Sequence, residues 1–241
     1  MKTMIGMVTI GKSSATRERA VNRAQLYAKR HGYEFAQIHS AVRPGTTRTP
    51  HWEKTLVPQA FPGYERYWII DDDILINHRI APALPSVAAG NIGLVREPLP
   101  DDPANNVPWV GNTGVMLLES AGLDLLTKAY DLGEYKDVPP GFGDQPAVNV
   151  VAWRENRVTR LEWKWNYLLM ADWLMCAHGQ AYPWTKSLAL GRLAKGTLTL
   201  RLMTRELWKQ SDAVLSRLRE AYAVHLTWYR MGANLVDKVL G

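Results

Sequence analysis

The stretch YWIIDDDILI, residues 67–76, carries the sharpest signal in this sequence. Its first four residues are apolar and predict a buried strand, and three aspartates follow directly at the carboxyl end of that strand. In open α/β sheets, this edge of the sheet is where ligands bind. Because side chains alternate along an extended chain, we expect Asp71 and Asp73 to share one face while Asp72 points away.

Two carboxylates on one side of a strand end can form half of a site for a hard divalent cation. Their oxygens suit Mg²⁺ or Mn²⁺, and such a cation can neutralise a diphosphate leaving group. An isolated run of aspartates would otherwise be an acidic turn or a helix cap. The apolar strand before Asp71 favours the metal site, because like charges crowded together repel each other unless a cation is bound.

The flanking segments predict an α/β domain that opens with a βαβ unit, and hence parallel pairing. Residues 4–10 are apolar and strand-like, residues 13–30 have helical spacing with Gly32 as the stop, and residues 33–39 form a second strand. Further strands are expected at 91–96 and 115–118, and helices at 51–60, 122–130, 145–154 and 204–223.

The composition allows one sizeable domain over residues 1–241. The net charge of +6 suits nucleic acid, anionic lipid or a phosphorylated ligand. Cys176 is the one cysteine, so no intramolecular disulfide can form. Residues 1–11 lack a signal-peptide cleavage site, and no stretch has the ~18 consecutive apolar residues of a membrane span. We expect a cytoplasmic protein, unless a targeting segment precedes this chain.

Five ordered blocks resemble the GT-A fold glycosyltransferases. The resemblance is greatest to the retaining group that includes glycogenin and bacterial lipopolysaccharide galactosyltransferases. The sequence also resembles the related Golgi α-galactosyl and xylosyl transferases. The blocks are NRAQLYAKRHGYEF (22–35), HWEK (51–54), the aspartate triplet, NTGVMLLE (112–119) with GDQPAVN (143–149), and VHLTW (224–228); LEWKWNYL (161–168) resembles a further segment. The resemblance spans most of the chain. It implies a Rossmann-like α/β fold of GT-A type, with a mixed sheet flanked by helices and a helical basic region toward the C-terminus.

The resemblance also implies metal-dependent transfer of a sugar from a UDP-sugar or other nucleotide-sugar donor to a glycan or glycolipid. It implies that the transfer retains the anomeric configuration of the donor sugar. It assigns Mn²⁺ (or Mg²⁺) to Asp71, Asp73 and His225. Asp144 and Gln145 would lie beside the donor sugar as the catalytic residues. The donor-binding set would be Thr9, Lys54, Asp71, Asn112 and Arg230. Arg230 stands where the group has a lysine that grips the diphosphate.

Simpler interpretations compete with these assignments. Alone, His225 among apolar neighbours would be a core residue, Asp144 a helix cap, and Lys54 a solvated lysine on a helix. The interval between Asn166 and His225 is longer than the resemblance predicts. We expect its basic, leucine-rich part, about residues 170–223, to be an insertion that binds the acceptor or the surface of an anionic membrane.

Two other classes of function stay open. One is a phosphatase similar to the haloacid dehalogenases, with Asp71 as nucleophile. Leu75 departs from that motif, and the motif would belong on the first strand rather than near residue 70. The other is a non-catalytic basic protein that binds nucleic acid or lipid. The Asp-Gln and His blocks argue against both, and we expect no nucleic-acid partner.

Overall fold

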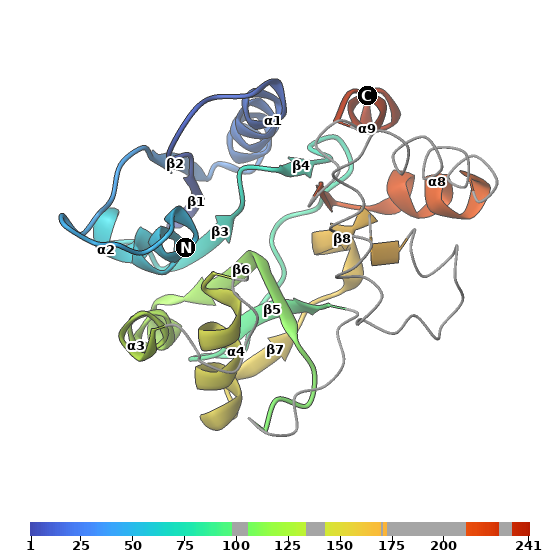
Figure 1. The fold of residues 1–241 in the computed structure, drawn as a ribbon. Coiled ribbons are helices and arrows are strands. Elements are labelled where there is room, and N and C mark those ends of the chain that lie inside the picture. The colour runs from blue at the N-terminus through green and yellow to red at the C-terminus, as the bar shows by residue number, and fades with distance from the viewer. Residues whose placement is uncertain (98–105, 134–142, 170, 173–210, 227–232) are drawn as a thin grey trace, which may run out of the picture.

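A six-stranded mixed sheet forms the centre of the chain. The computed structural model describes residues 1–97, 106–133, 143–169, 171–172, 211–226 and 233–241 (Figure 1). The strand order is β2-β1-β3-β6-β5-β7. The bounds are β1 Thr3–Val8, β2 Glu34–Ile38, β3 Arg66–Ile70, β5 Ile92–Arg96, β6 Gly111–Glu119 and β7 Val158–Arg160. Strand β6 runs antiparallel to β3 and β5, whereas the other pairs are parallel, which confirms the expected mixed sheet.

A second, three-stranded sheet has the order β4-β9-β8 and lies beside the first. Its strands are β4 Ile74–Ile76, β9 Ala223–His225 and β8 Tyr167–Leu168. The helical elements are α1 Ala15–His31, η1 Pro50–Leu56, α2 Val57–Ala60, η3 Ser120–Gly122, α3 Asp124–Leu132, α4 Gln145–Arg154, η4 Trp163–Asn166, α8 Ser211–Glu220 and α9 Ala233–Leu240. Figure 1 shows α1 and α9 near β4, and α3 and α4 on the opposite side of the main sheet.

Strand β3 is buried on both faces and divides two hydrophobic cores. Trp68 and Ile70 enter a core shared with α1, α8 and α9, whereas Tyr67 and Ile69 enter one shared with η1, α3 and α4. Burying each such side chain stabilises the fold by roughly 1.5–3 kcal/mol. Two-sided burial explains why β3 is a continuous apolar run rather than an alternating one.

Local patterns predicted the opening βαβ unit and α4, but two helices differ from expectation. Ser14 caps α1, and Gly32 ends it with a φ of 67°. The helix expected at 51–60 is mostly a 3₁₀ helix, with Pro58 in the short α2 that follows. Helix α8 ends before Ala223, because residues 223–225 pair with β4 instead. Within the described residues, no helix combines the length and hydropathy that a membrane span needs.

Candidate functional site

The aspartate triplet forms a turn at the carboxyl end of β3. The Asp71 amide donates to the carbonyl of Gly114 on β6 (2.9 Å), and the Ile74 amide donates to the Asp71 carbonyl (3.3 Å). The expectation of an extended chain through the triplet is therefore wrong. The turn nevertheless brings Asp71 and Asp73 close to one histidine, and it directs Asp72 elsewhere.

Each aspartate of the triplet has its own basic partner. Asp71 Oδ1 lies 2.8 Å from Lys54 Nζ. Arg17 Nε donates to Asp72 Oδ2 at 2.7 Å. Asp73 Oδ1 lies 3.2 Å from His225 Nε2. Three adjacent carboxylates are thus tolerated at a buried strand end because three separate elements, η1, α1 and β9, supply the compensating groups.

Asp71, Asp73 and His225 form a candidate metal centre. One ligand atom from each lies within 4.8 Å of the others. Strand β9 carries His225 into place by pairing with β4, in the register Ile74↔His225. Gly114 leaves room for the ring, since a Cβ there would lie 2.3 Å from His225 Cε1.

The donor set of this cluster fits a divalent cation. Carboxylate oxygens suit Mg²⁺ or Mn²⁺, and an imidazole nitrogen is a common ligand of transition-metal ions. Burial alone would lower the pKa of His225, but Asp73 and Asp71 outweigh it and raise that pKa above its usual value. The cluster therefore attracts positive charge. His225 Nδ1 is buried without a hydrogen-bond partner among the described residues.

Lys54 is fully buried and joins the metal centre to α4. Its Nζ contacts Asp71 Oδ1 at 2.8 Å and Asp144 Oδ1 at 3.2 Å, and it donates to the Thr113 carbonyl at 3.1 Å. Burial opposes its charge, but the carboxylates of Asp144 and Asp71 raise the pKa of Lys54 above its usual value. The alternative of a solvated lysine is therefore wrong.

Asp144 occupies the N-cap position of α4, but its side chain makes no capping bond. The carboxylate turns to Lys54 instead, and its other oxygen, Oδ2, is buried with no hydrogen-bond partner among the described residues. Burial raises the pKa of Asp144, and Lys54 opposes that rise. The alternative interpretation, that the Asp144 side chain caps α4, is therefore wrong.

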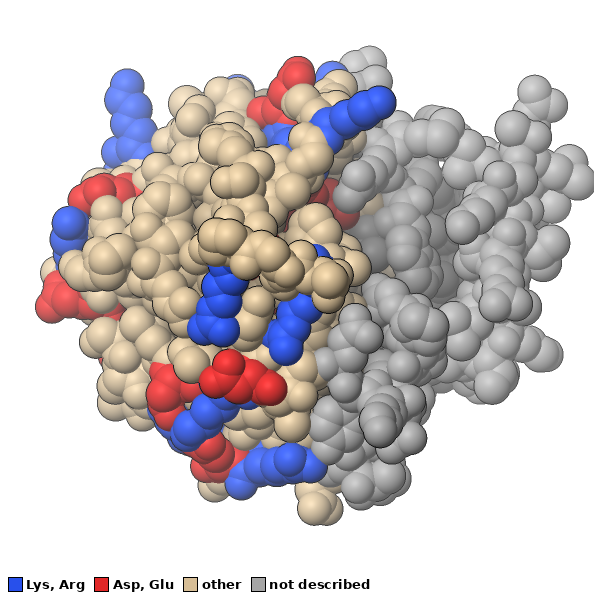
Figure 2. Space-filling model, turned by 60° about the vertical axis from the view of Figure 1, so that its left-hand side comes forward, with Lys and Arg blue, Asp and Glu red and all other residues tan. Residues whose placement is uncertain are grey.

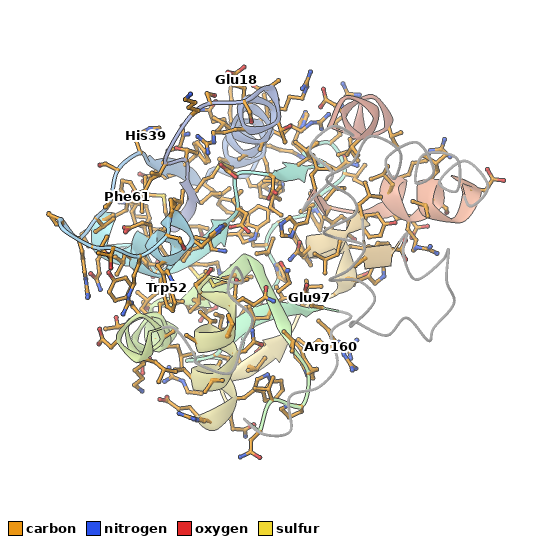
Figure 3. All side chains as sticks on the ribbon, in the orientation of Figure 1. Glu18, His39, Trp52, Phe61, Glu97 and Arg160 are labelled. Atoms are coloured by element: carbon orange, nitrogen blue, oxygen red, sulfur yellow. The ribbon has the colours of Figure 1, made fainter. Side chains whose placement is uncertain are left out.

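A chain of amides surrounds a second acid, Glu97, next to this centre. Asn166 Nδ2 donates to Asn112 Oδ1 (2.8 Å), and Asn112 Nδ2 donates to Glu97 Oε2 (3.2 Å). Gln145 Nε2 donates to the same oxygen at 2.6 Å, and Gln145 Oε1 accepts from the Thr113 amide. Burial raises the pKa of Glu97, although both amides oppose the rise. Figure 3 labels Glu97 at the end of β5.

Sequence reasoning missed Glu97 and Arg17. Glu97 follows a strand directly, as Asp71 does, so the same signal could have found it. Arg17 carries no such signal, because its importance lies in contacts that its long side chain makes beyond its own helix.

One expected donor residue, Thr9, stands apart from this cluster. Thr9 lies at the end of β1 beside β2, where its Oγ1 is 2.9 Å from His39 Nδ1. Arg230 lies outside the described residues, as does most of the expected insertion at 170–223.

Solved glycosyltransferase structures share this fold. A glycosyltransferase involved in the glycosylation of the major capsid of PBCV-1 aligns over 99% of both chains, with a TM-score of 0.62 and 14% identity. The galactosyltransferase LgtC, in complex with donor and acceptor sugar analogues, aligns over 99% of this chain and 95% of its own, with a TM-score of 0.55 and 10% identity. The glycosyltransferase GlyE of Streptococcus pneumoniae TIGR4 aligns over 72% of this chain and 48% of its own, with a TM-score of 0.51 and 15% identity.

Comparison with protein-family models found no match, and comparison with curated proteins found none either. At these low identities the structural likeness shows the fold. The chain therefore has the GT-A fold that the aspartate motif and its accompanying blocks predicted.

Proposed function

We propose that this chain is a metal-dependent glycosyltransferase that moves a sugar from a nucleotide-sugar donor to an acceptor. The observation that carries the proposal is the Asp71–Asp73–His225 cluster at the carboxyl edge of the sheet of a GT-A fold. A divalent cation held there, Mn²⁺ or Mg²⁺, would neutralise charge on the diphosphate of the leaving nucleotide.

The chain's own residues divide the remaining work. Lys54 holds Asp71 and Asp144 in fixed positions and supplies a buried positive charge beside the leaving group. Gln145 and Asn112 orient the Glu97 carboxylate, and the resemblance puts Gln145 and Asp144 beside the donor sugar. Such an arrangement acts mainly by positioning and by preorganised charge.

A screen for nucleotide release tests this function. Purified protein is incubated with UDP- and GDP-sugars, with and without Mn²⁺, and the released nucleotide is measured. We expect release from a UDP-sugar that requires the cation. Asp71→Asn and Asp73→Asn should each abolish it, whereas the exposed Asp131→Asn should not. Release of phosphate from aryl phosphates, with no dependence on sugar nucleotides, would favour the phosphatase instead.

We further propose that transfer retains the donor's configuration, as in the group that the sequence resembles. The glycosidic bond formed from an α-linked donor should then be α, which NMR of the product's anomeric proton measures; a β-linked product would exclude retention.

Two retaining routes differ in the role that they give to the Asp144 carboxylate. Asp144→Asn should abolish turnover if the Asp144 carboxylate is the nucleophile of a double displacement. Residual turnover would favour a front-face attack, in which the leaving phosphate takes the acceptor's proton.

The face drawn in Figure 2 does not favour a nucleic-acid-binding role. Figure 2 shows Asp and Glu interspersed with Lys and Arg on the face in view.

The proposed contact of residues 170–223 with the acceptor or with an anionic membrane concerns a segment that lies mostly outside the described residues. Sedimentation with anionic liposomes, comparing the parent with a variant that has Gln at Arg192, Lys195 and Arg201, tests the membrane contact.

A further inference from the structure

The proposed metal site includes Asp71 and Asp73 but does not include Asp72. Asp72 is nevertheless largely buried and paired with Arg17, whose side chain is 14% exposed. A pair so shielded from water is less screened than a surface ion pair, so it can fix a geometry.

Arg17 binds a whole loop as well as Asp72. It lies in the first turn of α1, and the β1–α1 loop, residues 9–14, folds around its guanidinium. Nη1 donates to the carbonyls of Thr9 (3.0 Å) and Gly11 (3.1 Å), and Nη2 donates to that of Ile10 (3.2 Å). Gly11 has a φ of 94°, which favours glycine. Three consecutive carbonyls therefore converge on one planar group, whose Nε holds Asp72 at 2.7 Å.

The loop and the triplet leave the sheet at the same edge. Strands β1 and β3 are parallel neighbours with Met7 opposite Ile70, so the loop after β1 lies next to the aspartates after β3. The metal centre, Lys54 and the Glu97 network lie on the β6 side of β3. The β1–α1 loop and His39, at the end of β2 (Figure 3), lie on the other side.

We propose that Arg17 and Asp72 form a clamp that fixes the β1–α1 loop to receive the nucleoside end of the donor. The inference rests on the proposed function: with the diphosphate at the metal centre and the sugar beside Gln145, the nucleoside extends toward β1 and β2. Both residues are then positioning residues, which act through the loop and do not touch the donor.

The clamp makes predictions that a simple surface charge would not. Arg17→Gln should raise the donor KM by about tenfold, the scale of one lost charge-assisted contact, with little change in kcat. Arg17→Lys should behave almost as badly, because a point charge cannot span three carbonyls and a carboxylate. Asp72→Asn should raise the same KM, and the double variant should be no worse than Arg17→Gln alone. Lys29→Gln, an exposed position on the same helix, is the matched control.

Hydrogen exchange of the free protein supplies a readout independent of activity. The Thr9 amide donates to the Ile38 carbonyl at 2.8 Å and should exchange faster in Arg17→Gln. A parent protein that turns over no sugar nucleotide overturns the proposed function and the nucleoside assignment with it. An active parent whose Arg17→Gln variant keeps its donor KM overturns the clamp alone. A raised KM without faster exchange also overturns it, because Arg17 would then be touching the donor directly.

Discussion

At the scale of single residues, Lys54 shows how burial changes the weight of a salt bridge. Its ammonium group joins two carboxylates, Asp71 and Asp144, inside the protein. Lys128 makes the same kind of contact on the surface, at 2.9 Å from Asp124 and 2.6 Å from Glu155. Both lysines join two carboxylates but differ in solvation, and Arg157 also contacts both of the surface carboxylates.

We therefore expect Lys54→Met to be far more damaging than Lys128→Met. Removing the buried cation leaves two carboxylates desolvated and close together, and breaking such an interaction costs about 3–5 kcal/mol of unfolding free energy. Water and salt screen the charges of Lys128, Asp124 and Glu155, so the loss of unfolding free energy in Lys128→Met should be small. Urea unfolding at neutral pH measures both. Equal losses would show that Lys54 contributes no more than a surface charge.

At the scale of elements, β6 holds the site together through close contacts. Its first half provides the Asn112 side chain, the Thr113 carbonyl that binds Lys54, and the Gly114 carbonyl that binds the Asp71 amide. Gly114 also lets His225 pack directly against the strand. Strand β6 thus aligns the candidate metal centre with the Glu97 network.

We expect Gly114→Ala to weaken Mn²⁺ binding by about 10–100-fold, the loss typical when the support of a metal ligand is disturbed. The new Cβ would lie 2.3 Å from His225 Cε1, so the ring must move. Gly111→Ala is the control on the same strand, because its Cβ would meet Leu94 at 2.5 Å instead. Overpacking should destabilise both variants by about 1–3 kcal/mol. Calorimetric titration with Mn²⁺ should separate them, and equal affinities would show that His225 needs no such support.

At this scale, the sequence predicted the elements whose structure is determined by residues within the same segment. Helix α4 and the opening βαβ unit follow from periodicity and caps within the segments themselves. The triplet marked the edge of the sheet where the site lies. The burial of Lys54 left no local trace, since the carboxylate that compensates it on α4 comes from much later in the chain. The turn at the triplet also depends on a distant residue, Gly114.

At the scale of the whole molecule, the three side chains of the site come together only when the N-terminal half and the C-terminal segment have both folded. Asp71 and Asp73 belong to the N-terminal half, and His225 arrives with β9 near the C-terminus. Helix α9 is in turn fastened to α1, where the buried Arg23 donates through Nε to Asp237 Oδ1 at 2.7 Å. The candidate metal centre therefore forms only when the complete fold has assembled.

Because His225 is far from Asp71 and Asp73 in the unfolded chain, a cation that binds all three must stabilise the folded protein. At a Mn²⁺ concentration 100 times its dissociation constant, mass action adds about 2.7 kcal/mol. For a chain of this size, that corresponds to a rise in Tm of roughly 5–10 °C. Calorimetric or fluorescence melting, with and without Mn²⁺, measures the rise. Asp73→Asn should lose it, because one of the three ligands is gone, whereas Asp131→Asn should keep it. An unchanged Tm at a Mn²⁺ concentration that supports nucleotide release would place the cation elsewhere than at Asp71, Asp73 and His225.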